Sequence, residues 1–208
     1  LARKEKKIRI VHVISALYVG GTEMMLYKLL SRMRKDRFEN IVLTLKEKGG
    51  FNKDFESRNI SVYNVGDMGS VLRVSALIKL LKILRQIKPD LIQGWLSHGN
   101  LVVSLMSVFK PYRFSTLWNI RHTVFARGEI KHTTLFIIKF LSLLSFLPRK
   151  IIFNSKAGAD DHYRMGYRRD KSCIIPNGFD TKLFMQSDKE RSSVRSELNI
   201  PEEAMVIG

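Results

Sequence analysis

The sequence is poor in cysteine, in acidic residues and in long apolar runs. Its 208 residues include a single cysteine, Cys173, which excludes an internal disulfide and is typical of a reducing compartment. No apolar run reaches the roughly 20 residues that span a bilayer, and residues 1–14 lack an apolar core long enough for a signal peptide. The sequence therefore predicts a cytoplasmic protein.

Charge of one sign dominates. The chain has 36 Lys and Arg against 19 Asp and Glu, a formal net charge of +17, while 45% of its residues are hydrophobic and 10% aromatic. Such a composition supplies a packed core and excludes disorder, collagen and a coiled coil as descriptions of the whole chain. The length suits one domain, or one domain and a fragment of another.

Short β-branched runs alternate with helical patterns along the chain. The run at residues 8–14 is nearly continuous in apolar residues, as in a strand that is covered on both faces of a parallel sheet. After Gly20 and Gly21, an amphipathic pattern predicts a helix that Thr22 caps, and a second clear pattern predicts a helix over residues 71–87. Seven strands are predicted, at residues 8–14, 41–45, 61–64, 91–94, 116–120, 151–154 and 172–175.

This alternation predicts an α/β fold, a doubly wound, mostly parallel, Rossmann-like sheet with helices on both faces. We expect this domain to cover residues 1–185. Residues 186–208 contain a charged segment with a short helix and then Met205–Gly208, which read as the start of another buried strand. We interpret residues 186–208 as an interdomain connection and the beginning of a missing second domain.

Ligands of open parallel sheets bind at the carboxyl ends of the strands, so residues that follow strands are the candidates for a functional site. Gly20 and Gly21 precede a helix and would let backbone amides approach a phosphate, although a glycine pair can also serve only a tight turn. The pair is not a GxGxxG fingerprint, which argues against a nicotinamide cofactor.

Polar side chains follow the fourth and fifth predicted strands. Trp95, His98 and Asn100 are predicted to share one loop, and Arg121 and His122 the neighbouring one. Histidine titrates near neutral pH and can accept a proton or position a hydroxyl, but either histidine could equally be a packed or solvated residue. We expect no metal, because no carboxylate lies at ligand spacing from these residues.

Two later segments carry turn and capping signals. Residues 151–167 read as a strand followed by a helix, with Asn154, or else Ser155, as its cap. Further on, Asn177, Gly178 and Asp180 form a turn after Pro176, in which Asp180 is expected to bond nearby backbone amides.

Five segments, taken in order, resemble the N-terminal half of the GT-B fold glycosyltransferases of family 4, a retaining group that includes enzymes of lipopolysaccharide and capsule assembly. They are HVISALYVGGTE, KPDLIQGWLSH, NIRHT, FNSKAGADDHYRMGY and IIPNGFDTKLF. The resemblance implies a two-domain enzyme, of which this chain holds the acceptor-side domain and lacks the donor-binding one, so this chain alone is expected to be inactive.

The resemblance also implies roles for individual residues. Gly20 and Gly21 would lie against the diphosphate of a nucleotide-sugar, and His122 would be the catalytic residue beside the transferred sugar. The implied reaction is hexosyl transfer, with retained anomeric configuration and without cofactor or metal, to a glycan or lipid-linked acceptor in cell-surface polysaccharide synthesis. Residues on the acceptor or sugar side would be Trp95, His98, Asn100 and Arg121, and the loop beside the hinge would hold Asn177, Gly178 and Asp180.

Two alternatives remain open for a chain with this charge: a dinucleotide-binding Rossmann domain, and a basic nucleic-acid-binding domain, for which no recognition motif is present. Residues 133–148 are almost entirely apolar and are flanked or interrupted by Arg127, Lys131, Lys139, Arg149 and Lys150. This segment predicts either a helix buried against the sheet or a peripheral contact with an anionic membrane surface on the inner face of the cytoplasmic membrane.

Overall fold

The computed structural model describes residues 6–46, 49–66, 74–109, 113–123 and 132–207. These residues form two compact units, Leu1–Pro176 and Asn177–Gly208. The first unit holds one sheet of seven strands in the order β3-β2-β1-β4-β5-β6-β7. The strands are β1 (Ile8–Ile14), β2 (Phe38–Thr44), β3 (Ser61–Asn64), β4 (Leu91–Trp95), β5 (Ser115–Ile120), β6 (Lys150–Phe153) and β7 (Ser172–Ile174).

All six strand pairings are parallel, which confirms the predicted doubly wound α/β fold. Strand β2 begins three residues before its predicted start, because Phe38, Glu39 and Asn40 pair with the first residues of β1. The order of the strands reverses between β1 and β4, which are neighbours in the sheet. Loops after these two strands therefore meet at the point where ligands of such sheets bind.

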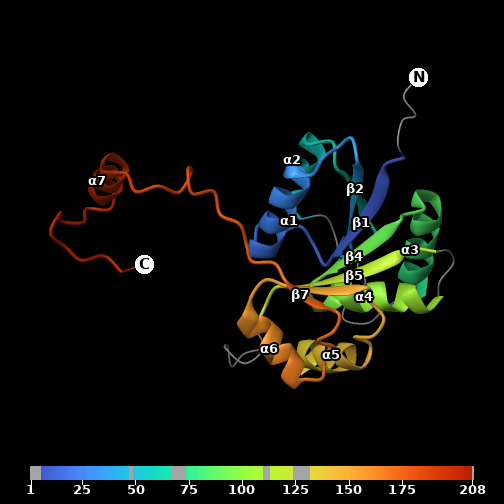
Figure 1. Ribbon diagram of the computed structural model, residues 1–208. Coiled ribbons are helices and arrows are strands. Elements are labelled where there is room, and N and C mark those ends of the chain that lie inside the picture. Colours follow the sequence, from blue (N-terminus) through green and yellow to red (C-terminus); the bar gives the residue numbers. More distant parts are fainter. Residues whose placement is uncertain (1–5, 47–48, 67–73, 110–112, 124–131, 208) are drawn as a thin grey trace. The chain divides into compact units, whose positions relative to one another are not determined.

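Helices cover both faces of the sheet (Figure 1). Helices α1 (Gly21–Arg32) and α2 (Asn52–Ser57) pack on one face, where Leu26, Leu30 and Phe55 contact Ile14 and Val42. On the opposite face, the buried residues of β1, β2 and β4–β6 pack against helices α3 (Val74–Ile87), α4 (Leu96–Phe109), α5 (His132–Leu143) and α6 (Lys156–Arg164).

Helix α1 does not start at its predicted cap. It begins at Gly21 with Gly20 at the N-cap position, so Thr22 lies inside the first turn. Of the two caps predicted for helix α6, the structure has Ser155, whose hydroxyl accepts a hydrogen bond from the Gly158 amide at 3.1 Å. The helix predicted over residues 71–87 is confirmed from Val74, and residues 71–73 lie outside the described part of the chain.

The second unit contains the predicted short helix, α7 (Asp188–Glu197), which Ser187 caps. Arg195 holds the turn after it by donating hydrogen bonds to the carbonyls of Pro201 and Ala204. Met205, Val206 and Ile207 were predicted to open a buried strand, but they are exposed and belong to none of the described strands. The predicted boundary between residues 185 and 186 stays a prediction.

Candidate active site at the carboxyl edge of the sheet

Three predicted positions follow the carboxyl ends of neighbouring parallel strands. Gly20 follows β1, His98 follows β4, and His122 follows β5, so all three lie at one edge of the sheet, as predicted. Gly178 was predicted at the same edge, but it belongs to the second unit, so its place at this edge stays a prediction. The edge is the candidate site, and the roles of these residues remain predictions.

The backbone does not require glycine at either position of the Gly20–Gly21 pair. Gly20 has a φ of −156°, which any residue adopts, and Gly21 is the first residue of α1. A Cβ atom on Gly21 would meet nothing within 4 Å. A Cβ on Gly20, by contrast, would lie 2.7 Å from the Glu23 carboxylate, so the open space at the helix N-terminus is in front of Gly21.

The loop that carries these glycines is held from the side by the segment after β2. The Lys46 amide donates to the Ser15 carbonyl at 2.8 Å, and the Phe51 amide donates to the Leu17 carbonyl at 3.2 Å. A Cβ on Gly49 would lie 2.1 Å from that same Leu17 oxygen, so only glycine fits there. The path of residues 15–20 is thus fixed by packing.

The predicted loop containing Trp95, His98 and Asn100 does not exist. Trp95 is the last residue of β4, and α4 begins at the next residue, Leu96. The positive φ of Leu96, +62°, makes the turn from strand to helix without an intervening loop. His98 lies exposed in the first turn of α4. Gly99 permits this placement, since a Cβ there would lie 2.5 Å from the Val13 carbonyl.

Trp95 and Asn100 lie in the interior, with exposed fractions of 1% and 0%, and not on the ligand-facing surface. The Asn100 side chain bonds to the backbone of Asn119 on β5, at 3.4 and 3.5 Å. Trp95 donates its indole N–H to His12 Nδ1 at 3.3 Å. These contacts give both side chains structural partners, and the geometry offers no support for a direct contact with an acceptor.

The buried histidine His12, on β1, connects three strands. Its Nε2 lies 3.2 Å from Asn40 Oδ1 on β2, and its Nδ1 accepts from Trp95 on β4. The indole can only donate, so the proton of neutral His12 is on Nε2. The Arg121 guanidinium, which follows β5, lies 5.6 Å from the centre of the Trp95 ring, a cation–π distance. His12 thus supports Trp95, and Trp95 supports Arg121 at the edge.

Sequence reasoning missed His12, although it is the one titratable residue inside an otherwise apolar stretch of β1. Burial lowers the pKa of His12 to about 4, despite the hydrogen bonds that favour its charged form. It is therefore neutral at physiological pH and acts as a fixed hydrogen-bonding group.

Positive charge at the edge comes from Arg121 and Lys46, which follow β5 and β2. Burial lowers the pKa of Arg121, and partial burial together with the nearby Lys46 lowers the pKa of His98, which favours its neutral form. Lys46 is exposed, and Glu23 adds one negative charge in the first turn of α1. The two cations suit an anionic ligand at this edge.

His122 is half-buried. Burial, and secondarily the neighbouring His162, lower the pKa of His122 to about 4, so its imidazole is neutral near pH 7. The centres of the two imidazole rings lie 5.4 Å apart. His162, on α6, was also missed by sequence reasoning, since nothing in its spacing relates it to His122.

In the second unit, Asp180 accepts hydrogen bonds from the amides of Lys182 and Leu183 at 3.2 Å, which confirms the bonds predicted for it. The turn itself lies at residues 181–183, after Asp180, and not at Asn177 and Gly178 as predicted. Within the described ranges, no group of three or more His, Cys, Asp or Glu could hold a metal ion.

Helix α5 presents an apolar stripe to solvent. Ile138 and Leu141 are buried, whereas Phe136, Phe140 and Leu143 are exposed. The segment is therefore partly core, as the buried-helix alternative predicted, and partly exposed, and the predicted membrane contact of the exposed face stays a prediction. In the described part of the chain, no helix has the length and apolar character needed to cross a bilayer.

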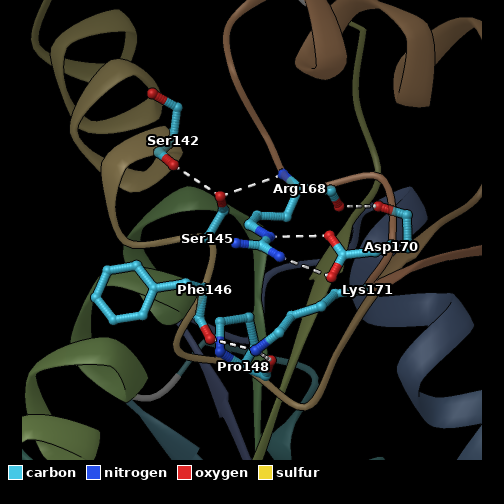
Figure 2. Close-up of polar contacts among 8 residues, drawn as sticks. Ser142, Ser145, Phe146, Pro148, Arg168, Asp170 and Lys171 are labelled. Carbon is cyan, nitrogen blue, oxygen red and sulfur yellow. Dashed lines mark hydrogen bonds and ion pairs between the residues drawn. The ribbon is translucent and has the colours of Figure 1, made fainter.

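The turn after α5 is tied to the turn before β7 (Figure 2). The Ser145 hydroxyl donates to the Ser142 carbonyl at 2.7 Å and accepts from the Arg168 amide at 3.2 Å. Lys171 donates to the carbonyls of Phe146 and Pro148. These bonds hold the backbone at Phe146, whose exposed ring points away from the polar cluster in Figure 2.

The fold and the edge define a doubly wound α/β domain with an anion-compatible ligand site. Residues 19–183 match the family model described as Glycosyltransferase Family 4, and the chain belongs to this family. The comparison with curated proteins found no match.

Solved structures of glycosyltransferases share the fold. HepE from Anabaena, in complex with UDP-glucose, is 21% identical with a TM-score of 0.74, over 92% of this chain and 50% of HepE. Sucrose-phosphate synthase from Thermosynechococcus elongatus is 13% identical with a TM-score of 0.66, over 95% of this chain and 54% of the synthase. The lipopolysaccharide outer core galactosyltransferase WaaB is 12% identical with a TM-score of 0.62, over 83% of this chain and 46% of WaaB. The chain therefore spans about half the length of these proteins.

Proposed function

We propose that this chain is the N-terminal, acceptor-side domain of a retaining GT-B glycosyltransferase that moves a hexose from a nucleotide-diphosphate-sugar to a glycan or lipid-linked acceptor of a cell-surface polysaccharide. The observation that carries the proposal is the family match over residues 19–183. HepE, half of which shares this fold, was solved in complex with UDP-glucose, which favours a nucleotide-sugar over a dinucleotide or a nucleic acid as the ligand.

The glycine loop suits the donor diphosphate. The free amides in the first turn of α1 point to the edge, and the missing side chain at Gly21 leaves them accessible. During transfer, negative charge grows on the departing diphosphate. The helix N-terminus and the cations at the edge would stabilise that charge where it develops.

His122 and Arg121 suit the sugar side of the same edge. A neutral imidazole can accept a hydrogen bond from a sugar hydroxyl, and the low pKa of His122 keeps it in that form. In this proposal the segment of Asn177, Gly178 and Asp180 leads into the hinge between the two domains.

A binding experiment on the intact protein separates the proposal from its alternatives. The protein is titrated with UDP-sugars, nicotinamide dinucleotides and a random oligonucleotide at two salt concentrations. We expect saturable binding of a nucleotide-sugar at both concentrations, because shape and hydrogen bonds as well as charge hold it. Preference for a dinucleotide, or oligonucleotide binding alone that is lost at higher salt, would contradict the proposal.

A substitution tests the role of the glycine loop in that binding. Gly21→Val fills the open space in front of the α1 amides and is expected to weaken nucleotide-sugar binding. Gly50→Val is the control, since a Cβ there also meets nothing within 4 Å but Gly50 does not begin a helix. Equal affinity in the two variants would remove the glycine loop from the donor site.

The exposed stripe of α5 is proposed to rest on an anionic membrane surface, with the protein peripheral on the inner face of the cytoplasmic membrane. Phe136, Phe140 and Leu143 are exposed on one stripe, and exposed basic residues Lys139, Arg149 and Lys150 accompany them. Apolar side chains beside cations suit such a surface, where each cation contributes up to about 1 kcal/mol. Arg127 and Lys131 lie outside the described residues.

Co-sedimentation with vesicles tests this contact. We expect the intact protein to bind vesicles of anionic lipid at moderate salt. The double variant Phe136→Ser/Phe140→Ser should bind them at least roughly tenfold more weakly, because the burial of apolar surface is lost. Val108→Ser, an exposed apolar residue of α4, is the matched control and should bind as the wild type does. No binding to anionic vesicles at low salt would remove the membrane proposal and leave the transferase proposal untouched.

A further inference from the structure

Two histidine rings lie beside each other, that of the half-buried His122 after β5 and that of the buried His162 on α6. The rings of His122 and His162 are 5.4 Å apart, centre to centre, at an interplanar angle of 72°. His162 is only 1% exposed and also contacts the rings of Phe153 and Tyr167, at 5.5 and 4.8 Å. The His162 ring is thus enclosed on three sides by aromatic groups, one of which is His122.

The hydrogen bond of His162 determines its tautomer. Its Nδ1 lies 2.7 Å from the Gly158 carbonyl oxygen, and a carbonyl can only accept, so Nδ1 carries the proton of the neutral ring. The other nitrogen, Nε2, is then an acceptor. Among the described residues it has no hydrogen-bond partner, although it is buried. A buried acceptor without a partner is unfavourable and is uncommon in folded proteins.

His122 also has a buried ring nitrogen, Nε2, without a hydrogen-bond partner among the described residues. Its backbone carbonyl is pressed against α6, since a Cβ on Gly158 would lie 3.2 Å from the His122 oxygen. Both the ring and the backbone of His122 are therefore held by the same helix.

The structure forms no hydrogen bond between these two Nε2 atoms. We propose that they nevertheless pair, which makes His162 a positioning residue for His122: the His162 Nε2 lone pair would select the His122 tautomer that carries its proton on Nε2, and would leave the Nδ1 lone pair of His122 for the ligand. The opposite tautomer would set two buried lone pairs against each other, which is electrostatically unfavourable. His122 then accepts a hydrogen bond at the edge and does not donate one. The nature of that ligand, a sugar hydroxyl, rests on the proposed function, whereas the pairing of the histidines does not.

Two substitutions at position 162 separate this role from a merely structural one. The side-chain amide of His162→Gln reaches the place of Nε2 and can still present an acceptor to His122. The shorter side-chain amide of His162→Asn reaches only the place of Nδ1. It can still donate a hydrogen bond to the Gly158 carbonyl, but it presents no acceptor to His122. If His162 only completes the packing of α6, the Asn variant should leave His122 as it is in the wild type. If His162 positions His122, only the Gln variant should do so.

The readout is the protonation of the His122 ring nitrogens in the intact protein, measured by long-range ¹H–¹⁵N correlation after labelling with ¹⁵N-histidine. The signals of His122 are assigned by their loss in His122→Ala. We expect Nε2 protonated and Nδ1 unprotonated in the wild type and in the Gln variant, and tautomer exchange, with the two nitrogen shifts drawn together, in the Asn variant. Tyr167→Phe is the control: it removes the bond from Tyr167 to the Ile138 carbonyl but neither nitrogen of His162, so the His122 signals should stay unchanged.

A wild-type His122 protonated on Nδ1 would overturn the proposal, and so would a His122 spectrum in the Asn variant identical to that of the wild type. The wild-type spectrum decides even if neither variant folds. Turnover provides an independent comparison, in which the Gln variant should keep most of the wild-type kcat and the Asn variant should lose at least tenfold. An absence of sugar transfer by the wild type, with the expected spectra, would count against the proposed function alone.

Discussion

At the scale of single residues, buried histidines couple the stability of this protein to pH. His12 and His122 both have a pKa of about 4 in the folded state, mainly because burial penalises their charged forms. In the unfolded chain each recovers the ordinary value near 6.5. Between pH 6.5 and about 4 the unfolded state therefore binds more protons, and stability falls as the pH falls.

This linkage predicts an acid-sensitive fold. For His12 alone, lowering the pH from 7 to 5 should reduce the free energy of unfolding by about 2 kcal/mol. Urea denaturation at pH 7, 6 and 5 measures it, and His12→Gln should show a shallower dependence over this range. The carboxylates of Asp36 and Asp170, whose pKa values are lowered by Arg34 and Arg168, act only at lower pH. Stability that does not change between pH 7 and 5 would contradict the neutral, buried state of His12.

The individual site residues could be predicted only where they follow a strand. Gly20, His98, Arg121 and His122 were found in this way, because strand ends are visible in the sequence and parallel topology brings them together. The link from Asn40 through His12 to Trp95 depends on the register of three strands, and the His122–His162 pair depends on the packing of α6. Neither relation has a local sequence signal.

At the scale of elements, the strands were predictable because each is a short apolar run that is buried in a parallel sheet. The start of α4 was not, since it depends on the positive φ of Leu96 and on the close approach of Gly99 to Val13. Likewise, the apolar composition of α5 could not show which of its faces is buried, because apolar residues lie on all sides of it. Tertiary contacts determine both the start of α4 and the buried face of α5.

The end of α3 offers a test of backbone strain. Lys88 follows the helix with a φ of +50°, in the left-handed region that favours glycine, and its side chain is exposed. Lys88→Gly should therefore stabilise the protein by about 0.5–1 kcal/mol. Lys79→Gly, at an exposed position inside α3, should instead destabilise it by a similar amount, because glycine is a poor helix former. Urea midpoints of the two variants that shift in the same direction would argue against strain at Lys88.

At the scale of the whole molecule, one edge of the sheet collects the features that we propose to bind and react. The open N-terminus of α1, the cations Lys46 and Arg121 and the neutral His122 all follow parallel strands whose carboxyl ends meet there. The proposed contact with a membrane-borne acceptor would be made by a different surface, the exposed stripe of α5. A domain of this family with these two surfaces is suited to bring a nucleotide-sugar to a lipid-linked acceptor.

The most direct test of the account is the release of nucleoside diphosphate from nucleotide-sugars by the intact protein in the presence of a lipid extract that contains acceptors. The account predicts acceptor-dependent release, and a loss of roughly 100-fold or more in His122→Ala with a nearly unchanged melting temperature, if the side chain acts on the transition state. Full activity in His122→Ala, or the absence of release from every nucleotide-sugar tried, would contradict it.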